Sequence, residues 1–227
     1  GRMALRVFYG GTLDPVHAGH LSVACEVRDA LDAQVFLVPA ADPPHKDETH
    51  ADADARARML DLAIAGEPGL KVDRRELHRD GPSYTVDTLR ELRAEAGPDT
   101  PLVWMIGGDS LLQLHTWNRW RELFTLAHVL AVARPGAHLE PDALAVVAPE
   151  VEAEIGARRR PASSLNSAAA GGLAVFPLHR ERPESSTELR RRMAAGEAWE
   201  TGVAPCVAEY IRRHRLYGVR DVTPASL

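Results

Sequence analysis

The chain has 227 residues, of which 45% are hydrophobic and 26% are charged, a composition typical of a globular protein with a buried core. It holds 27 Lys and Arg residues against 32 Asp and Glu residues, so the formal net charge is −5. This acidic balance argues against bulk binding of nucleic acid or membrane surfaces, although it leaves room for a local basic pocket. We expect a single domain over residues 1–227 and assign no function to residues 1–2.

The two cysteines, Cys25 and Cys206, are far apart in the chain and fit no metal-ligand spacing. We therefore expect two buried, free thiols in a reducing compartment. No apolar run approaches the length of a membrane span. The residues after Met3 lead directly into a strand-like segment, which argues against a signal peptide. Together these features predict a cytoplasmic protein.

In chain order, short apolar runs alternate with helical patterns, which favours βαβ units around a parallel sheet. Strands are expected at residues 5–9, 35–38, 70–72, 102–106, 128–133 and 173–176. Helices are expected at residues 20–31, 54–65, 83–92, 185–194 and 207–214. We predict a doubly wound, Rossmann-like α/β fold, its parallel sheet flanked by helices, with a small C-terminal helical part at about 185–217. Ligands of such folds bind outside the carboxyl ends of the strands.

Two segments carry more local predictions. Ser83 is expected to be the N-cap of a helix, with Tyr84 beside it as a core residue. Farther along, three consecutive arginines precede a tract rich in Ala, Ser and Gly, so residues 158–172 are predicted to form a mobile surface loop.

The most informative motif follows the first strand. Gly10-Gly11-Thr12 is a turn without Cβ atoms at its first two positions, where backbone N–H groups can approach a phosphate. His17-Ala18-Gly19-His20 then opens a helix, whose positive dipole end lies at the same place. Both histidines can point into that anion site and donate hydrogen bonds, or neutralise charge if protonated. The alternative is a tight strand–helix turn with two surface histidines. Neither a dinucleotide-binding fingerprint nor a Walker loop fits these residues.

The whole run from Gly10 to His20, GGTLDPVHAGH, resembles the signature of the nucleotidyltransferase superfamily with the (H/T)xGH motif. Within it, the chain is most similar to the bacterial nicotinate mononucleotide adenylyltransferases. The resemblance implies transfer of AMP from ATP to nicotinate mononucleotide, which yields nicotinate adenine dinucleotide and pyrophosphate in NAD biosynthesis. It implies an ATP site built from Gly10, Gly11, Thr12, Gly19, Ile106, Gly107, Asp109, Arg134, Ser186 and Thr187.

A second block, Pro43-Pro44-His45-Lys46, is a stiff loop that ends in a cation. The resemblance implies that Lys46 reaches the ATP phosphates, whereas the residues alone fit an exposed loop with a solvated lysine. Asp109 follows the clearest central strand, where its carboxylate could bind ribose hydroxyls, lie near a metal–phosphate group or cap a helix.

The resemblance assigns the mononucleotide to Thr85, Trp117 and Asn118. Trp117 follows polar residues in an expected loop, where its flat face could stack on a planar ring. Backbone N–H groups near Trp117 and Asn118 would then hold the carboxylate of nicotinate. Trp104 and Trp120 are expected to be structural.

A last block, Ser185-Ser186-Thr187-Glu188-Leu189-Arg190, places hydroxyls at a helix N-terminus, where they normally cap. It also resembles the second signature of the family, ISSTxIR, which implies phosphate contacts and a catalytic guanidinium at Arg190. The departure is Glu184, which stands where the family has an aliphatic residue.

The resemblance therefore implies His17, His20, Lys46 and Arg190 as catalytic residues that act mainly by positioning and charge neutralisation. Mg²⁺ is expected to arrive with ATP, without a dedicated metal site in the protein. The expected partners are ATP and nicotinate mononucleotide, with no nucleic acid and no membrane. Two alternatives stay open: a relative that uses phosphopantetheine or nicotinamide mononucleotide, and a nucleotide sensor that binds ATP without turnover.

Overall fold

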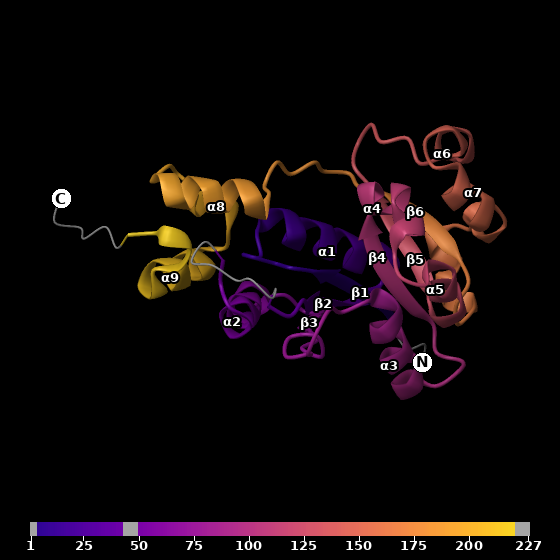
Figure 1. Ribbon diagram of the computed structural model, residues 1–227, viewed down its shortest axis with the longest axis horizontal. Coiled ribbons are helices and arrows are strands. Elements are labelled where there is room, and N and C mark those ends of the chain that lie inside the picture. The colour runs from indigo at the N-terminus through magenta and orange to yellow at the C-terminus, as the bar shows by residue number, and fades with distance from the viewer. Residues whose placement is uncertain (1–3, 43–49, 221–227) are drawn as a thin grey trace.

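The computed structural model describes residues 4–42 and 50–220. Six parallel strands form one sheet in the order β3-β2-β1-β4-β5-β6 (Figure 1). The strands are β1 (Leu5–Gly11), β2 (Ala33–Pro39), β3 (Leu70–Val72), β4 (Leu102–Gly107), β5 (His128–Ala133) and β6 (Leu173–Pro177). Each contains a segment predicted from the apolar runs. The doubly wound α/β prediction is confirmed.

Strand β1 lies in the middle of the sheet, and the chain reverses its direction of travel across the sheet at this strand. Val7 is opposite Val35 of β2 on one side and Val103 of β4 on the other. The carboxyl ends of β1 and β4 therefore open side by side at the topological switch point, where folds of this kind bind ligands. Tyr9 pairs with Met105 there, which places Gly10 and Gly11 beside Ile106 and Gly107.

Helices cover both faces of the sheet, because successive strand residues point to opposite sides. Val7 contributes to one core and Phe8 to the other. The first core is covered by α1 (Ala18–Leu31), α2 (Ala53–Ile64), α8 (Ser186–Ala195) and α9 (Pro205–His214). The second is covered by α3 (Thr85–Ala96), α4 (Gly108–Leu112), α5 (Leu123–Leu126), α6 (Pro141–Val147) and α7 (Pro149–Ile155). In Figure 1, α8 and α9 lie at one end of the long axis and α6 and α7 at the other.

Short 3₁₀ helices complete the described structure: η1 (Leu114–Thr116), η2 (Trp120–Glu122), η3 (Gly156–Arg158), η4 (Ala162–Ser167), η5 (Glu200–Gly202) and η6 (Leu216–Gly218). Across residues 4–42 and 50–220, no helix is both long and apolar enough to span a bilayer. Trp104 and Trp120 are buried in the second core, as expected for structural residues. Both cysteines are free, but Cys206 is exposed and Cys25 only half-buried, so the prediction of buried thiols is wrong.

The start of α3 differs from the prediction. Tyr84, not Ser83, occupies the N-cap position, and its side chain makes no cap hydrogen bond. Tyr84 is 42% exposed, so it is not a core residue. The Ser83 hydroxyl instead accepts a hydrogen bond from Arg79 at 3.3 Å. The prediction that Ser83 caps α3 is therefore wrong: the helix begins one residue later than expected, and the Ser83 oxygen accepts from a side chain instead of from the backbone of the helix.

Residues 158–172, expected to be a loose loop, carry regular structure and long-range contacts. Leu165 of η4 is fully buried in the first core. The His128 ring lies between two backbone groups of the segment, the Ala168 carbonyl at 2.7 Å and the Gly172 N–H at 2.9 Å. Arg93, from α3, donates to the Ala169 carbonyl at 2.9 Å. The composition of this segment did not indicate these contacts, because the side chains that hydrogen-bond to its backbone come from β5 and α3.

Candidate active site

The turn from β1 into α1 fixes both motif histidines through backbone hydrogen bonds. His17 is the N-cap of α1, and its Nδ1 accepts from the Gly19 N–H at 3.0 Å. The Nδ1 of His20 accepts from the His17 N–H at 3.1 Å, which closes a reciprocal capping box. A ring nitrogen that accepts carries no proton, so each neutral imidazole has its N–H at Nε2. Each histidine therefore keeps one donor for a ligand.

The two imidazoles are neutral in the folded protein at neutral pH. Burial lowers the pKa of His17 to about 4, against an opposing effect of Glu184. Burial also lowers the pKa of His20 to about 3, and the charge of His17 lowers it further. The rings stack with centroids 3.7 Å apart, so two positive charges there would repel. Before a ligand binds, the histidines thus act as hydrogen-bond donors, not as cations.

Two motif glycines are required by close contacts. A Cβ on Gly19 would lie 2.8 Å from Cε1 of His17, which would displace the capping ring. A Cβ on Gly10 would lie 2.7 Å from the Trp104 ring. Gly10 therefore lets an aromatic side chain cover the end of β1, a packing role that the phosphate-turn interpretation did not include.

A cavity of about 260 Å³, here called the basic cavity, opens beside these histidines. Among the predicted ATP-site and catalytic residues, it is lined by His17, Gly19, His20, Arg134 and Ser186. The sequence prediction missed other lining residues, notably Tyr9, Arg180, Arg182, Glu184 and Ser185. Three arginines against Glu181 and Glu184 give the lining an excess of positive charge, which suits a polyphosphate. The available signal was the charged run His179-Arg180-Glu181-Arg182-Pro183-Glu184 between β6 and α8, because it leads directly to the helix start that Ser185 caps.

A second cavity of about 300 Å³, here called the aromatic cavity, lies at the ends of β1 and β4. It is lined by six predicted residues, Gly10, Gly11, Thr85, Ile106, Gly107 and Trp117. Residues outside the predicted set that line it include Tyr9, Glu76, Ser83, Trp104 and Ser110. Tyr9 lines both cavities, so they are neighbours. A ligand with a phosphate end and a planar ring could extend from one cavity into the other.

The second signature is tied to the first through backbone carbonyls. Ser185 caps α8 by accepting from the Glu188 N–H at 3.0 Å. The Ser186 hydroxyl donates to the Pro15 carbonyl at 2.9 Å, and Nη1 of Arg190 donates to the Asp14 carbonyl at 2.6 Å. The start of α8 therefore holds the loop between β1 and α1. Glu184, the departure from the family pattern, pairs with Arg182 at 2.5 Å at the edge of the basic cavity.

Several predicted site residues line neither cavity. Thr12 is exposed, and its carbonyl accepts from the buried Arg56 at 2.8 Å. Asp109 is exposed within the first turn of α4, where Gly107 is the N-cap, so the capping alternative for Asp109 is wrong. Thr187 and Asn118 are exposed. Lys46 and the rest of Pro43-Pro44-His45-Lys46 lie outside the described residues.

The comparisons to known proteins agree with the fold. Residues 8–192 match the family described as cytidylyltransferase-like, so the chain is a nucleotidyltransferase of this class. A relative from Stenotrophomonas maltophilia, described as a probable nicotinate-nucleotide adenylyltransferase, is 46% identical over 227 residues, which cover 98% of this chain and 100% of the relative. A relative of the same description from Chromobacterium violaceum is 47% identical over 216 residues, covering 92% and 96%. The chain therefore belongs to the nicotinate-nucleotide adenylyltransferase family.

Solved structures with the same fold include nicotinic acid mononucleotide adenylyltransferase from Plasmodium falciparum. Its complex with NaAD aligns with a TM-score of 0.72 at 14% identity, covering 96% of this chain and 99% of that one. Its complex with APC aligns with a TM-score of 0.71. At this level of identity the likeness concerns the fold.

Proposed function

We propose that the chain transfers the adenylyl group of ATP to nicotinate mononucleotide and releases pyrophosphate, forming nicotinate adenine dinucleotide in NAD biosynthesis. The observation that carries this proposal is the pair of adjoining cavities at the ends of β1 and β4, one basic and one aromatic, with Tyr9 in both. Their chemistry suits the triphosphate of one substrate and the pyridine ring of the other.

In the reaction, an oxygen of the mononucleotide 5′-phosphate attacks the α-phosphorus of ATP, and the bond from that phosphorus to the bridging oxygen of pyrophosphate breaks. The nucleophile is already an anion, so the protein need not supply a strong base. Its task is to align the groups and stabilise charge on the transferring phosphate. Nε2–H of His17 and of His20 are the donors that we assign to that phosphate.

The pyrophosphate leaving group is assigned to the basic cavity. Arg134, Arg180 and Arg182 surround it, and Ser186 lies at its edge. Lys46 and Arg190 remain proposed contributors. Nη1 of Arg190 donates to the Asp14 carbonyl, so this residue would reach phosphate through Nη2. Among the described residues, the Nη2 contact is a long one of 3.5 Å to the Thr187 hydroxyl.

Magnesium is expected to bind with the triphosphate. Across the described residues, no group of three or more His, Cys, Asp or Glu side chains could hold a metal ion. The donor set fits a hydrated ion that keeps most of its water and meets the protein at one carboxylate, for which exposed Asp109 at the end of β4 is the candidate. Bound there, Mg²⁺ would neutralise part of the phosphate charge.

The mononucleotide is assigned to the aromatic cavity. Trp117 offers a ring face for stacking, and Thr85 lies at the start of α3. Backbone N–H groups at Trp117 and Asn118 are proposed to hold the nicotinate carboxylate. We propose small molecules as the only substrates, and a cytoplasmic location because both cysteines are free.

The test is pyrophosphate release with ATP and Mg²⁺, offering nicotinate mononucleotide, nicotinamide mononucleotide and phosphopantetheine in separate reactions. We expect release with nicotinate mononucleotide. Release with phosphopantetheine alone would contradict the proposed acceptor, and release with none of the three would favour a sensor that binds ATP without turnover.

A further inference from the structure

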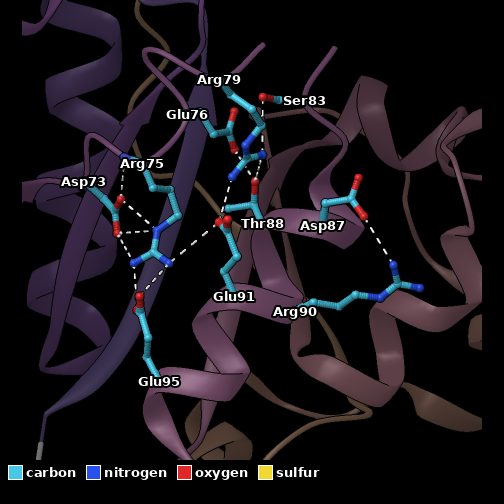
Figure 2. A network of polar contacts seen from close by, with 10 residues as sticks. All are labelled: Asp73, Arg75, Glu76, Arg79, Ser83, Asp87, Thr88, Arg90, Glu91 and Glu95. Carbon is cyan, nitrogen blue, oxygen red and sulfur yellow. Dashed lines mark hydrogen bonds and ion pairs between the residues drawn. The ribbon is translucent and has the colours of Figure 1, made fainter. Parts of the chain in front are cut away.

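One wall of the aromatic cavity comes from the connection between β3 and α3 and from the start of α3. Glu76, Ser83 and Thr85 of this stretch line the cavity. Because Tyr84 makes no side-chain cap, the entry into α3 is not held in the usual local way. Figure 2 shows what holds it instead: a polar network in which Arg79 reaches both the connection and the helix.

Arg79 makes three contacts that converge on this wall. Nη1 donates to the Ser83 hydroxyl at 3.3 Å and to the Thr88 hydroxyl at 3.0 Å. Nη2 donates to Glu91 at 2.7 Å. One planar guanidinium therefore links the residue before the helix to the helix itself, a geometry that a lysine ammonium cannot reproduce.

The contact with Thr88 has a direction. Thr88 is fully buried, and a hydroxyl has a single proton to donate. Arginine only donates, so the Thr88 oxygen accepts from Arg79 and its proton goes to Oε2 of Glu76, at 2.7 Å. The order Arg79, Thr88, Glu76 thus fixes the orientation of the Glu76 carboxylate in the cavity wall.

Glu76 depends on this arrangement. It is only 8% exposed, and among the described residues Thr88 donates the one hydrogen bond that the Glu76 carboxylate accepts. Burial raises the pKa of Glu76, while the Thr88 hydrogen bond and the charge of Arg79 oppose that effect. A buried carboxylate that loses its donor is strongly destabilised and must move or take up a proton.

Arg75 provides a matched comparison within the same network. Its side chain is 19% exposed, as is that of Arg79. Arg75 pairs with Asp73 at 2.9 Å and with Glu95 at 2.9 Å, and its Nη1 lies 4.0 Å from Glu91. None of its contacts drawn in Figure 2 reaches Ser83 or Thr88. It stabilises the same connection without touching the cavity wall.

We infer that Arg79 is a positioning residue for the mononucleotide: by holding Ser83 directly and Glu76 through Thr88, it fixes the wall of the aromatic cavity against which the ring and ribose bind. The inference rests on the proposed function and deepens it, since it names the device that shapes the acceptor half of the site. Arg79 touches no substrate in this arrangement.

The first experiment compares Arg79→Met with Arg75→Met. Methionine keeps an unbranched apolar chain and removes every donor. For Arg79→Met we expect the KM for nicotinate mononucleotide to rise roughly tenfold, equivalent to about 1.4 kcal/mol. The KM for ATP and kcat should change by less than about threefold, because the basic cavity is unaltered. Arg75→Met should leave all three close to wild type, and thermal midpoints are measured for every variant.

The second experiment tests the hydroxyl relay. Thr88→Val keeps the shape and removes the hydroxyl, whereas Thr88→Ser keeps it. We expect Thr88→Val to raise the KM for the mononucleotide and Thr88→Ser to restore it toward wild type. This pair also decides the matter if Arg79→Met fails to fold.

Equal mononucleotide KM values for Arg79→Met and Arg75→Met, or for Thr88→Val and Thr88→Ser, would overturn the inference and leave these residues with a purely structural role. A wild-type chain that turns over no nicotinate mononucleotide would instead overturn the proposed function, and the inference with it. The two failures are distinguished by the wild-type reaction.

Discussion

The two cavities differ in chemistry although they open at the same edge of the sheet and share Tyr9. The basic cavity is lined by Arg134, Arg180 and Arg182. The aromatic cavity has Trp104, Trp117 and one buried carboxylate, Glu76, and none of its described lining residues is a lysine or arginine. The sheet therefore determines where both cavities open, and the connections that follow individual strands determine the charge of the residues that line each cavity.

The contrast also separates how each half is organised. In the basic cavity the histidines are held by backbone groups within the same turn, His17 by Gly19 and His20 by His17. In the aromatic cavity the wall is held by side chains, chiefly Arg79. Substitutions in the first half should therefore act on the chemical step or on ATP binding, and those in the second half on binding of the acceptor.

The largest effect is expected for His20→Ala. Loss of the Nε2–H donor at the transferring phosphate should lower kcat by about 10²–10³-fold, as for removal of a single donor from an oxyanion site. The lost cap acceptor should cost about 1 kcal/mol of folding stability. Pyrophosphate release and thermal unfolding measure the two effects. His138→Ala, which removes an exposed histidine paired with Glu140, is the control and should keep wild-type turnover. Comparable turnover in both variants would remove His20 from the catalytic site.

Arg182→Met should weaken ATP binding without affecting the acceptor. A hydrogen bond between charged groups contributes about 1.5–3 kcal/mol, so the KM for ATP should rise roughly tenfold or more. The KM for nicotinate mononucleotide should stay within about twofold of wild type, since the cavities are chemically separate. Arg192→Met, on α8 beside Glu188, is the matched control. A rise in the mononucleotide KM instead would break the division between the two halves.

Trp117→Ala should weaken binding of the acceptor without affecting ATP binding. Aromatic stacking contributes about 0.5–1.5 kcal/mol beyond area burial, so the KM for nicotinate mononucleotide should rise about threefold to tenfold, with the KM for ATP unchanged. Trp117→Phe should retain most of the affinity. If alanine and phenylalanine have the same KM as tryptophan, the ring does not stack on this residue.

The smallest effect concerns stability and pH. The folded pKa values of His17 and His20, about 4 and about 3, lie below the ordinary value of 6.5. Below pH 6.5 the unfolded chain takes up protons that the folded protein refuses, so acidification from pH 6.5 toward 4 favours unfolding. His17→Asn retains a capping side chain but removes one titrating ring. Denaturant unfolding at pH 7 and 5 should therefore show a smaller loss of stability for His17→Asn than for wild type. An equal loss would show that His17 is not buried as a neutral ring.

The strands and several helix starts could be predicted from the sequence because their causes are local. Apolar runs bounded by Gly or Pro marked all six strands. The hydroxyls of Ser185-Ser186-Thr187 were expected to cap a helix, and Ser185 does so by accepting from the Glu188 N–H, three residues away. The GGTLDPVHAGH motif likewise identified a turn whose hydrogen bonds stay within four residues.

Only the tertiary structure decided the rest, because the partners come from distant parts of the chain. The Ser83 hydroxyl accepts from Arg79 instead of capping α3. Residues 158–172 are ordered by hydrogen bonds to the side chains of His128 and Arg93. Glu76 lines the aromatic cavity, and its carboxylate is oriented by a hydrogen bond from Thr88, twelve residues away. The neutral state of the motif histidines was also beyond the sequence, since burial, not residue type, lowers their pKa values. Residue types and spacing determined which groups the site has available, and packing determined which of them face it, and with what charge.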